Sequence, residues 1–199
     1  MAKRDHQFVK FVKKHLSQYD MKLIIGKGKR VNCNGFRCEG YFDESRGIIK
    51  VAAKDPCFLQ TLLHEYCHFL QYLKQLKVYK QSDSAGIIVD NWFQGKNYNK
   101  KTLKKAFFKV RAMERDCEKR AVKLIDKFNL KIDKKLYAKR AHCYIYSHFI
   151  MEKKRKYGMY KKSPYYSKNV LKIMPSNMAV LSHKSIPPKI YSVLESFTV

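Results

Sequence analysis

The feature that most constrains this chain is a set of polar side chains inside an otherwise apolar helix pattern. Residues 56–77 repeat apolar positions at helical spacing, and His64, Glu65 and His68 stand among them as H-E-x-x-H. Residues four apart lie one above the other on a helix, so both imidazoles can reach one ion. Burying them without a partner is costly, and a metal ion supplies the compensation. The alternative is a pair of hydrogen-bonded core histidines.

The residue between the two histidines completes a catalytic pattern. Glu65 lies one position round the helix from His64, beside the coordination position that a catalytic zinc ion leaves open. A carboxylate there can take a proton from the attacking water and later deliver it to the leaving amine. The pattern therefore predicts one Zn²⁺ ion with His64 and His68 as ligands and Glu65 as general base.

A third ligand is expected from the helix predicted at residues 102–128. Its apolar stripe consists of Leu103, Phe107, Val110, Cys117, Ala121, Leu124, Ile125 and Phe128. Glu114 falls within about 40° of the centre of that stripe, where a carboxylate needs a positive partner. We predict Glu114 as the third ligand and Glu118, at the margin of the stripe, as an acceptor that orients a ligand imidazole. Asp116 points to the opposite side.

Alternatives for these two acids stay open. Glu114 could instead pair with Arg111 or Arg115, and Glu118 could form an ordinary surface ion pair. His142 or His148, in the next predicted helix, could replace Glu114 as the ligand. The group that stabilises the oxyanion is also left open among Arg140, Tyr144, Tyr146 and His148.

The two motifs resemble the gluzincin branch of the zincin metallopeptidases, which combine H-E-x-x-H with a downstream Glu on another helix. The run from Glu114 to Ile125 is similar to the corresponding helix of ImmA/IrrE-type metallopeptidases, and it departs from that pattern at Cys117, Glu118 and Arg120. The pattern and the lysine-rich composition also resemble those of small phage-encoded metallopeptidases. The resemblance implies a zincin-like fold and hydrolysis of peptide bonds in a protein or peptide substrate, held extended along an edge strand.

Two other zinc classes fit less well. Metzincins need Gly and His where this chain has Gln71 and Lys74. A SprT-like protease acting on DNA-bound proteins would suit the basic charge, but its third ligand is a histidine, and none of the seven histidines lies between residues 69 and 141.

The expected architecture is an α+β domain with a small mixed β-sheet packed on long helices. Helices are predicted at residues 5–18, 56–77, 102–128, 133–157 and 187–197, and strands at 22–26, 37–42 and 47–53. Asp55 is expected to cap the 56–77 helix with Pro56 in its first position, and residues 43–47 to form a hairpin turn. Residues 78–101 read as a polar loop. We expect a catalytic domain at 1–157 and a basic, proline-containing extension at 158–199.

The charge predicts a polyanionic neighbour. Lys and Arg number 43 against 16 Asp and Glu, a net charge of +27, although a coding bias towards A and T also raises the lysine content. The best nucleic-acid patch combines basic residues with nearby tyrosines and comprises Lys153, Lys154, Arg155, Lys156, Lys161 and Lys162. Its alternative is a solvated helix end. The rival to a peptidase is therefore a basic nucleic-acid-binding protein with a structural or inactive metal site.

The remaining expectations concern the compartment and the cysteines. No targeting segment and no run of 18 apolar residues is visible, so we expect no membrane contact and a cytoplasmic location, in the host if the protein is viral. The six cysteines are expected to be reduced thiols, with Cys33 and Cys38 in a turn rather than in a second zinc site. Trp92 is expected in the core rather than in a substrate cleft. The sequence leaves the oligomeric state open.

Overall fold

The computed structural model describes residues 3–33, 35–156 and 163–197, and it divides the chain into two compact units. The first unit comprises the chain up to Leu76 together with Arg120–Ile132, and the second comprises Lys77–Lys119 and the chain from Asp133 onward. Helix α4 (Lys100–Lys127) begins in the second unit and ends in the first. The chain as a whole is a mixed α+β protein, as the sequence predicts.

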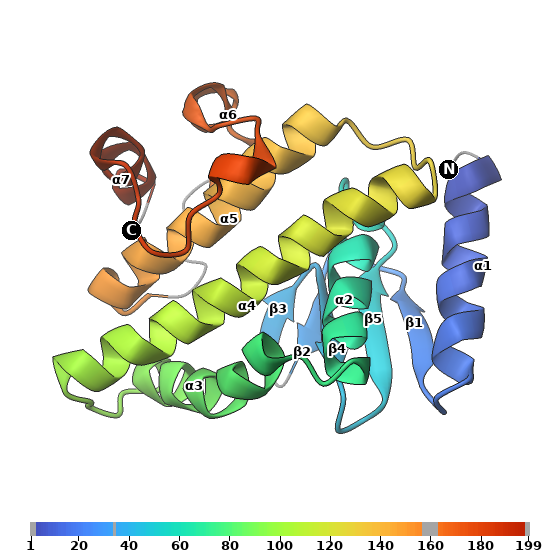
Figure 1. Ribbon diagram of the computed structural model, residues 1–199, viewed down its shortest axis with the longest axis horizontal. Coiled ribbons are helices and arrows are strands. Elements are labelled where there is room, and N and C mark those ends of the chain that lie inside the picture. The colour runs from blue at the N-terminus through green and yellow to red at the C-terminus, as the bar shows by residue number, and fades with distance from the viewer. Residues whose placement is uncertain (1–2, 34, 157–162, 198–199) are drawn as a thin grey trace. The chain divides into compact units, whose positions relative to one another are not determined.

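The first unit is built on a three-stranded sheet of mixed direction. Its strand order is β1 (Lys22–Gly26), β5 (Ile48–Ala52), β4 (Gly40–Asp43), with β1 parallel and β4 antiparallel to β5. The residues between β4 and β5 form the predicted hairpin connection. Helix α2 (Phe58–Leu73) packs on β4 and β5, and helix α1 (Lys3–Ser17) packs on β1 (Figure 1).

Aromatic contacts join α1, α2 and the end of α4 within this unit. The ring of Phe8 lies 5.9 Å from that of Tyr66 and 5.1 Å from that of Phe128, both edge to face. The Tyr66 hydroxyl lies 2.7 Å from Nδ1 of His15, so the buried tyrosine keeps a polar partner. These contacts fix the position of α2, the helix that carries the two histidines.

The predicted strand 37–42 is instead two strands. Strand β3 (Phe36–Cys38) pairs antiparallel with β2 (Val31–Cys33) in a separate ribbon, and the chain enters the main sheet only at Gly40. Gly40 lies so close to α2 that a Cβ atom there would stand 2.7 Å from Cγ2 of Thr61. The break between the strands therefore coincides with a close approach of the sheet to α2.

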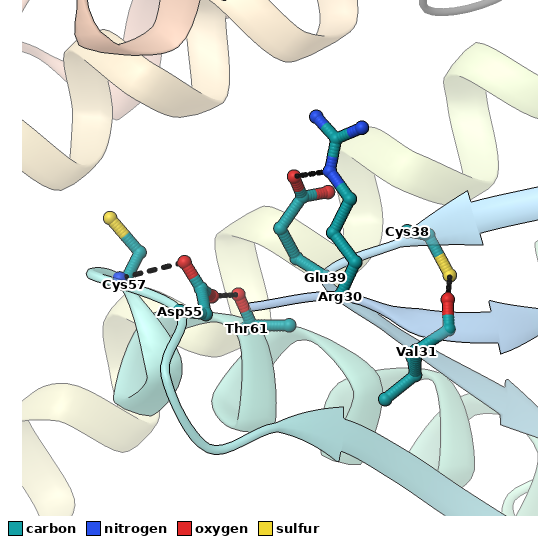
Figure 2. A network of polar contacts seen from close by, with 7 residues as sticks. All are labelled: Arg30, Val31, Cys38, Glu39, Asp55, Cys57 and Thr61. Carbon is teal, nitrogen blue, oxygen red and sulfur yellow. Dashed lines mark hydrogen bonds and ion pairs between the residues drawn. The ribbon is translucent and has the colours of Figure 1, made fainter. Parts of the chain in front are cut away.

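The start of α2 also differs from the prediction. The helix begins at Phe58 with Cys57 as its N-cap, so Pro56 precedes the helix and Asp55 is not the N-cap. Asp55 still binds this end: its carboxylate accepts the Cys57 N–H at 2.9 Å and the Thr61 hydroxyl at 2.6 Å (Figure 2). The two bonds stabilise an extra turn before the helix, which is why the start moves by two residues.

The second unit is helical. Its elements are α3 (Lys77–Phe93), the first part of α4, α5 (Lys134–Lys154), the 3-10 turns Pro164–Tyr166 and Met178–Val180, α6 (Lys168–Ile173) and α7 (Pro188–Glu195). A core of Cys143, Tyr146, Ile150, Val170, Met174, Ile190 and Leu194 joins α5 to α6 and α7. The described part of the C-terminal segment thus packs on α5.

The prediction of a loop at residues 78–101 is wrong for most of its length. Residues 77–93 form α3, which buries Ser82, Ala85 and Val89 on one face, and Val89 and Ala85 pack with Phe107 of α4. The intrinsic helix propensity of its serines, aspartates and Gly86 is low, but packing of an apolar face overrides propensity. Each helix that the structure describes is too short or too polar to cross a lipid bilayer.

Because β4 lies so close to α2, adding a single methyl group at Gly40 should have a large effect on stability. Gly40→Ala should lower the free energy of unfolding by about 1–3 kcal/mol, because the new Cβ would overlap Thr61 and lie 3.0 Å from Val51. Urea unfolding followed by circular dichroism measures this. Gly86→Ala is the matched control, since open space surrounds Gly86 within α3, and it should raise stability by about 0.5–1 kcal/mol. Equal stability of both variants would contradict the packing described.

Candidate metal centre

The two histidines of the H-E-x-x-H motif converge on adjacent turns of α2. The Nε2 atoms of His64 and His68 are 3.0 Å apart, and the two rings are nearly perpendicular, at 83°. The side chains of His68 and Glu65 are only 8% and 9% exposed, whereas His64 is half-buried. The helix thus places two imidazole nitrogens at one point at the edge of the core.

A buried glutamine fixes the orientation of His68. Nδ1 of His68 lies 2.9 Å from Oε1 of Gln71, which is fully buried one turn further along α2. Because an amide oxygen only accepts, Nδ1 carries the proton, and Nε2 of the neutral ring keeps its lone pair. Sequence reasoning missed this role of Gln71. The available signal was a polar residue three positions after His68, inside the apolar stripe.

Glu65 lies near the strand ribbon of the same unit. Burial, together with the nearby charges of Cys33, Glu65 and Glu39, raises the pKa of the Cys38 thiol to about 12. Cys38 Sγ faces the carbonyl of Val31, and Glu39 pairs with Arg30 at 3.5 Å (Figure 2). The end of β3 therefore runs close to the carboxylate of Glu65, with Cys38 protonated.

The two acids predicted from α4 are buried, as their place in the apolar stripe indicates. Glu114 is 7% exposed and Glu118 is 5% exposed. Both belong to the second unit, whereas His64 and His68 belong to the first. The assignment of Glu114 as a ligand, and of Glu118 as an acceptor for a ligand imidazole, stays a prediction.

Within the second unit, α5 supplies partners to these acids. The Tyr137 hydroxyl donates a hydrogen bond to the carboxylate of Glu118. Burial lowers the pKa of His148, and the nearby carboxylate of Glu114 opposes that shift. Further along, Arg111 pairs with Glu152 at 2.7 Å. As residue numbers increase along α4, the residue numbers of their partners on α5 decrease. The two helices therefore run antiparallel, with a row of polar contacts between them.

Two histidines of α5, His142 and His148, are alternatives for the third ligand, and His148 is also a candidate for stabilising the oxyanion. Nδ1 of His142 bonds the carbonyl of Ala138 at 2.8 Å, and Nδ1 of His148 bonds the carbonyl of Tyr144 at 3.0 Å. In each neutral ring, Nε2 is therefore the nitrogen left to act as a ligand or acceptor. Of the four candidates for stabilising the oxyanion, His148 is the one beside Glu114, whereas Tyr146 is 2% exposed in the core of α5.

Cys117 is a donor that sequence reasoning treated only as a small core residue. It is fully buried on α4, between Glu114 and Glu118, and it forms no disulfide. A thiolate binds zinc as readily as imidazole or carboxylate. The signal in the sequence was its departure from the Ala expected at this position of the ImmA/IrrE-type helix. Cys33 and Cys38 also form no disulfide, and neither belongs to a trio of metal donors in the described chain.

The predicted nucleic-acid patch at the end of α5 is largely engaged in contacts within the unit. Lys154 pairs with Glu195 at 3.1 Å, and Lys153 lies 3.9 Å from the same carboxylate. The Arg155 guanidinium lies 4.0 Å from the ring of Trp92 and donates to the carbonyls of Trp92 and Lys96. Lys156 is exposed, and Lys161 and Lys162 lie outside the described residues.

Comparison with known proteins gives no match: no family model, no curated protein and no solved structure is significantly similar to the chain. The resemblance to gluzincins and to ImmA/IrrE-type metallopeptidases therefore rests on the motif residues alone. The chemistry of this protein has to be argued from its own side chains.

The contact between Gln71 and His68 predicts a change in metal affinity. Gln71→Leu should weaken zinc binding about 10-fold to 100-fold, because the orienting acceptor for Nδ1 is lost. Competition with a zinc chelator measures the affinity. Gln71→Glu keeps an acceptor at the same place and should bind zinc at least as tightly as the wild type. If Gln71→Leu bound zinc unchanged, the orienting role would be wrong.

Proposed function

We propose that this protein is a zinc-dependent metallopeptidase in which His64 and His68 hold one Zn²⁺ ion and Glu65 is the general base. The observation that carries the proposal is the 3.0 Å separation of the two Nε2 atoms on α2. Two nitrogens at about 2.0–2.1 Å from one tetrahedral zinc ion stand about 3.3 Å apart. The pair therefore needs only a small adjustment to chelate a single ion.

The protonation state of His68 supports the same proposal. Gln71 holds the proton of His68 on Nδ1, so the lone pair of Nε2 points towards His64. This is the tautomer that a histidine ligand uses, with its second nitrogen donating to a fixed acceptor. Two neutral imidazoles without an ion between them would instead share one proton along the Nε2–Nε2 contact.

The third ligand is proposed to come from α4. Glu114 is our first choice, because it is a buried carboxylate on the face of α4 that carries the core residues. Cys117, the next buried donor along that face, would complete a His-His-Cys donor set of a kind that binds zinc, and it is the alternative. Glu118 is less suitable as a direct ligand because Tyr137 already donates to it.

The proposed reaction is hydrolysis of a peptide bond. A zinc ion bound by this set supplies a Lewis acid that polarises the scissile carbonyl and makes a neighbouring water more acidic. Glu65 accepts the proton of the attacking water and then passes it to the leaving amine, so the proton is conserved over the reaction. The partial burial of Glu65 keeps competing water away from its carboxylate.

The substrate is proposed to lie extended along β4. Among the described strands, β4 pairs with β5 on one side only, so its other edge offers backbone groups to an added strand. The chain just before β4 runs close to Glu65, and Gly40 at its start contacts Thr61 of α2. An added peptide strand would therefore pass near the general base.

The cytoplasmic location is proposed from the cysteines. None of the six forms a disulfide, and Cys67, Cys117 and Cys143 are fully buried as small apolar residues. Free thiols that are not used for disulfides are typical of a reducing compartment.

Metal content and activity test the proposal together. Purified protein should contain close to one zinc per chain by mass spectrometry, and His64→Ala should lose it. Glu65→Gln should keep the zinc and lower the rate of casein hydrolysis about 100-fold to 10,000-fold, because the general base is removed. His6→Ala, an exposed histidine on α1, is the control and should change neither value. Full activity of Glu65→Gln would refute the mechanism.

The third ligand is tested on α4. Glu114→Ala should weaken zinc binding by at least about 10-fold in the chelator assay, because losing a direct zinc ligand costs at least as much affinity as losing an orienting acceptor. If Glu114 is the ligand, Cys117→Ala should change the zinc affinity little. If the Cys117 thiol is the ligand, Cys117→Ala should instead cause the larger loss of zinc affinity. Asp116→Ala on the opposite side of α4 should leave the affinity unchanged. Unchanged affinity in both Glu114→Ala and Cys117→Ala would show that α4 provides no ligand.

A further inference from the structure

We propose that the second unit binds single-stranded nucleic acid on the exposed face at the beginning of α4, independently of the metal centre. The binding face, called here the α4 basic face, consists of Lys101, Lys104, Lys105, Phe108, Arg115 and the adjacent residues His183 and Lys184. It is distinct from the patch at the end of α5 that the sequence favours.

The first argument is the charge of α4. Residues 100–113 contain six Lys and Arg residues and no carboxylate. Counted at about 100° per residue, Lys101, Lys104 and Lys105 lie within about 60° of Phe108, so they share its side of the helix. All three are exposed. A row of cations without acids on one helix face is an electrostatic footprint for a phosphate backbone.

The segment after α6 adds further positive charge to the same face. Arg111 and Arg115 donate through Nε to the carbonyls of His183 and Leu181, which holds this segment against α4. Burial lowers the pKa of His183, and the nearby charges of Arg115, Lys184, Arg111 and Lys119 lower it further. Glu152 forms an ion pair with Arg111 at 2.7 Å, so the negative charge of this acid is already neutralised.

The second argument is an aromatic platform in the middle of these charges. Phe108 is 40% exposed, and its ring lies 4.9 Å from the ring of His183. An exposed phenylalanine alone is unremarkable, but one surrounded by cations and backed by an imidazole offers a surface on which a base can stack. Stacking on such platforms is largely independent of base identity, so the proposed binding is not sequence-specific.

The third argument is a groove at the beginning of α4. It has a volume of about 280 Å³ and is lined by Lys100, Leu103, Phe149, Glu152, Lys153, Ile186 and Tyr191. Two of its walls, Phe149 and Tyr191, are aromatic, and Lys100 provides a cation for a phosphate. Ile186 comes from the same segment as His183, so that segment contributes both to the groove and to the platform. Unstacked bases fit this combination, whereas the bases of a duplex are paired and not free to enter.

The experiment is fluorescence anisotropy of the full-length chain with a labelled 20-nucleotide oligothymidylate. We expect the logarithm of the association constant to fall linearly with the logarithm of the salt concentration. The slope should be about −0.7 for each phosphate contacted. Phe108→Ala should weaken binding about 5-fold to 150-fold, the equivalent of one stacked base. Phe108→Leu, which preserves an apolar side chain for folding, should show a similar loss.

A charge-matched pair of variants separates this face from the general positive charge of the protein. Lys104→Glu with Lys184→Glu should weaken binding at least about 10-fold more than Lys13→Glu with Lys14→Glu, two exposed lysines of α1 in the first unit. Both doubles change the net charge equally. Equal losses in the two doubles, together with no effect of Phe108→Ala, would overturn the proposal in favour of diffuse electrostatic attraction.

Two further comparisons complete the test. Chelation of zinc and the Glu65→Gln substitution should leave the affinity for the oligonucleotide unchanged, so the result does not depend on the peptidase proposal. A duplex of the same length should bind more weakly than the single strand. Tighter binding to the duplex, or to phosphatidylserine vesicles without any dependence on Phe108, would overturn the assignment to single-stranded nucleic acid.

Discussion

The free-energy cost of burying two imidazoles beside one another on a helix is the main constraint on the structure of the first unit. His64 and His68 have converging nitrogens at the edge of the core, and Gln71 determines which nitrogen of His68 is protonated. The neighbouring positions on α2, such as Leu63 and Phe69, are fully buried and hold the helix against the sheet and α1. The rigid packing around α2 is what keeps two polar rings in one geometry, and rigid placement is what a metal ligand pair requires.

Helix α4 carries the other unusual burial of charge in this protein. Glu114 and Glu118 are buried, and α5 meets them with His148 and the Tyr137 hydroxyl. A buried carboxylate without such partners would be neutralised or would destabilise the helix. The row of polar contacts between α4 and α5 thus preserves two ionisable groups on a face that would otherwise be apolar, which is a pattern common at functional sites.

Part of the strong positive charge of the protein lies on the surface of the second unit. Basic residues at the end of α5 are used internally, with Lys154 on Glu195 and Arg155 on Trp92. The beginning of α4, by contrast, keeps its lysines exposed around Phe108. The two proposals therefore use different parts of α4: the metal centre its buried middle, and the nucleic-acid face its exposed beginning.

The sequence by itself determined the features that depend on local spacing. The convergence of His64 and His68 follows from four residues of α-helix, and the burial of Glu114 follows from its place in a periodic stripe. The tertiary structure decided what depends on distant partners. Packing on Phe107 makes α3 a helix despite weak propensity, and contact with Thr61 places the start of β4 at Gly40. Such contacts join residues far apart in sequence, so no local pattern contains them.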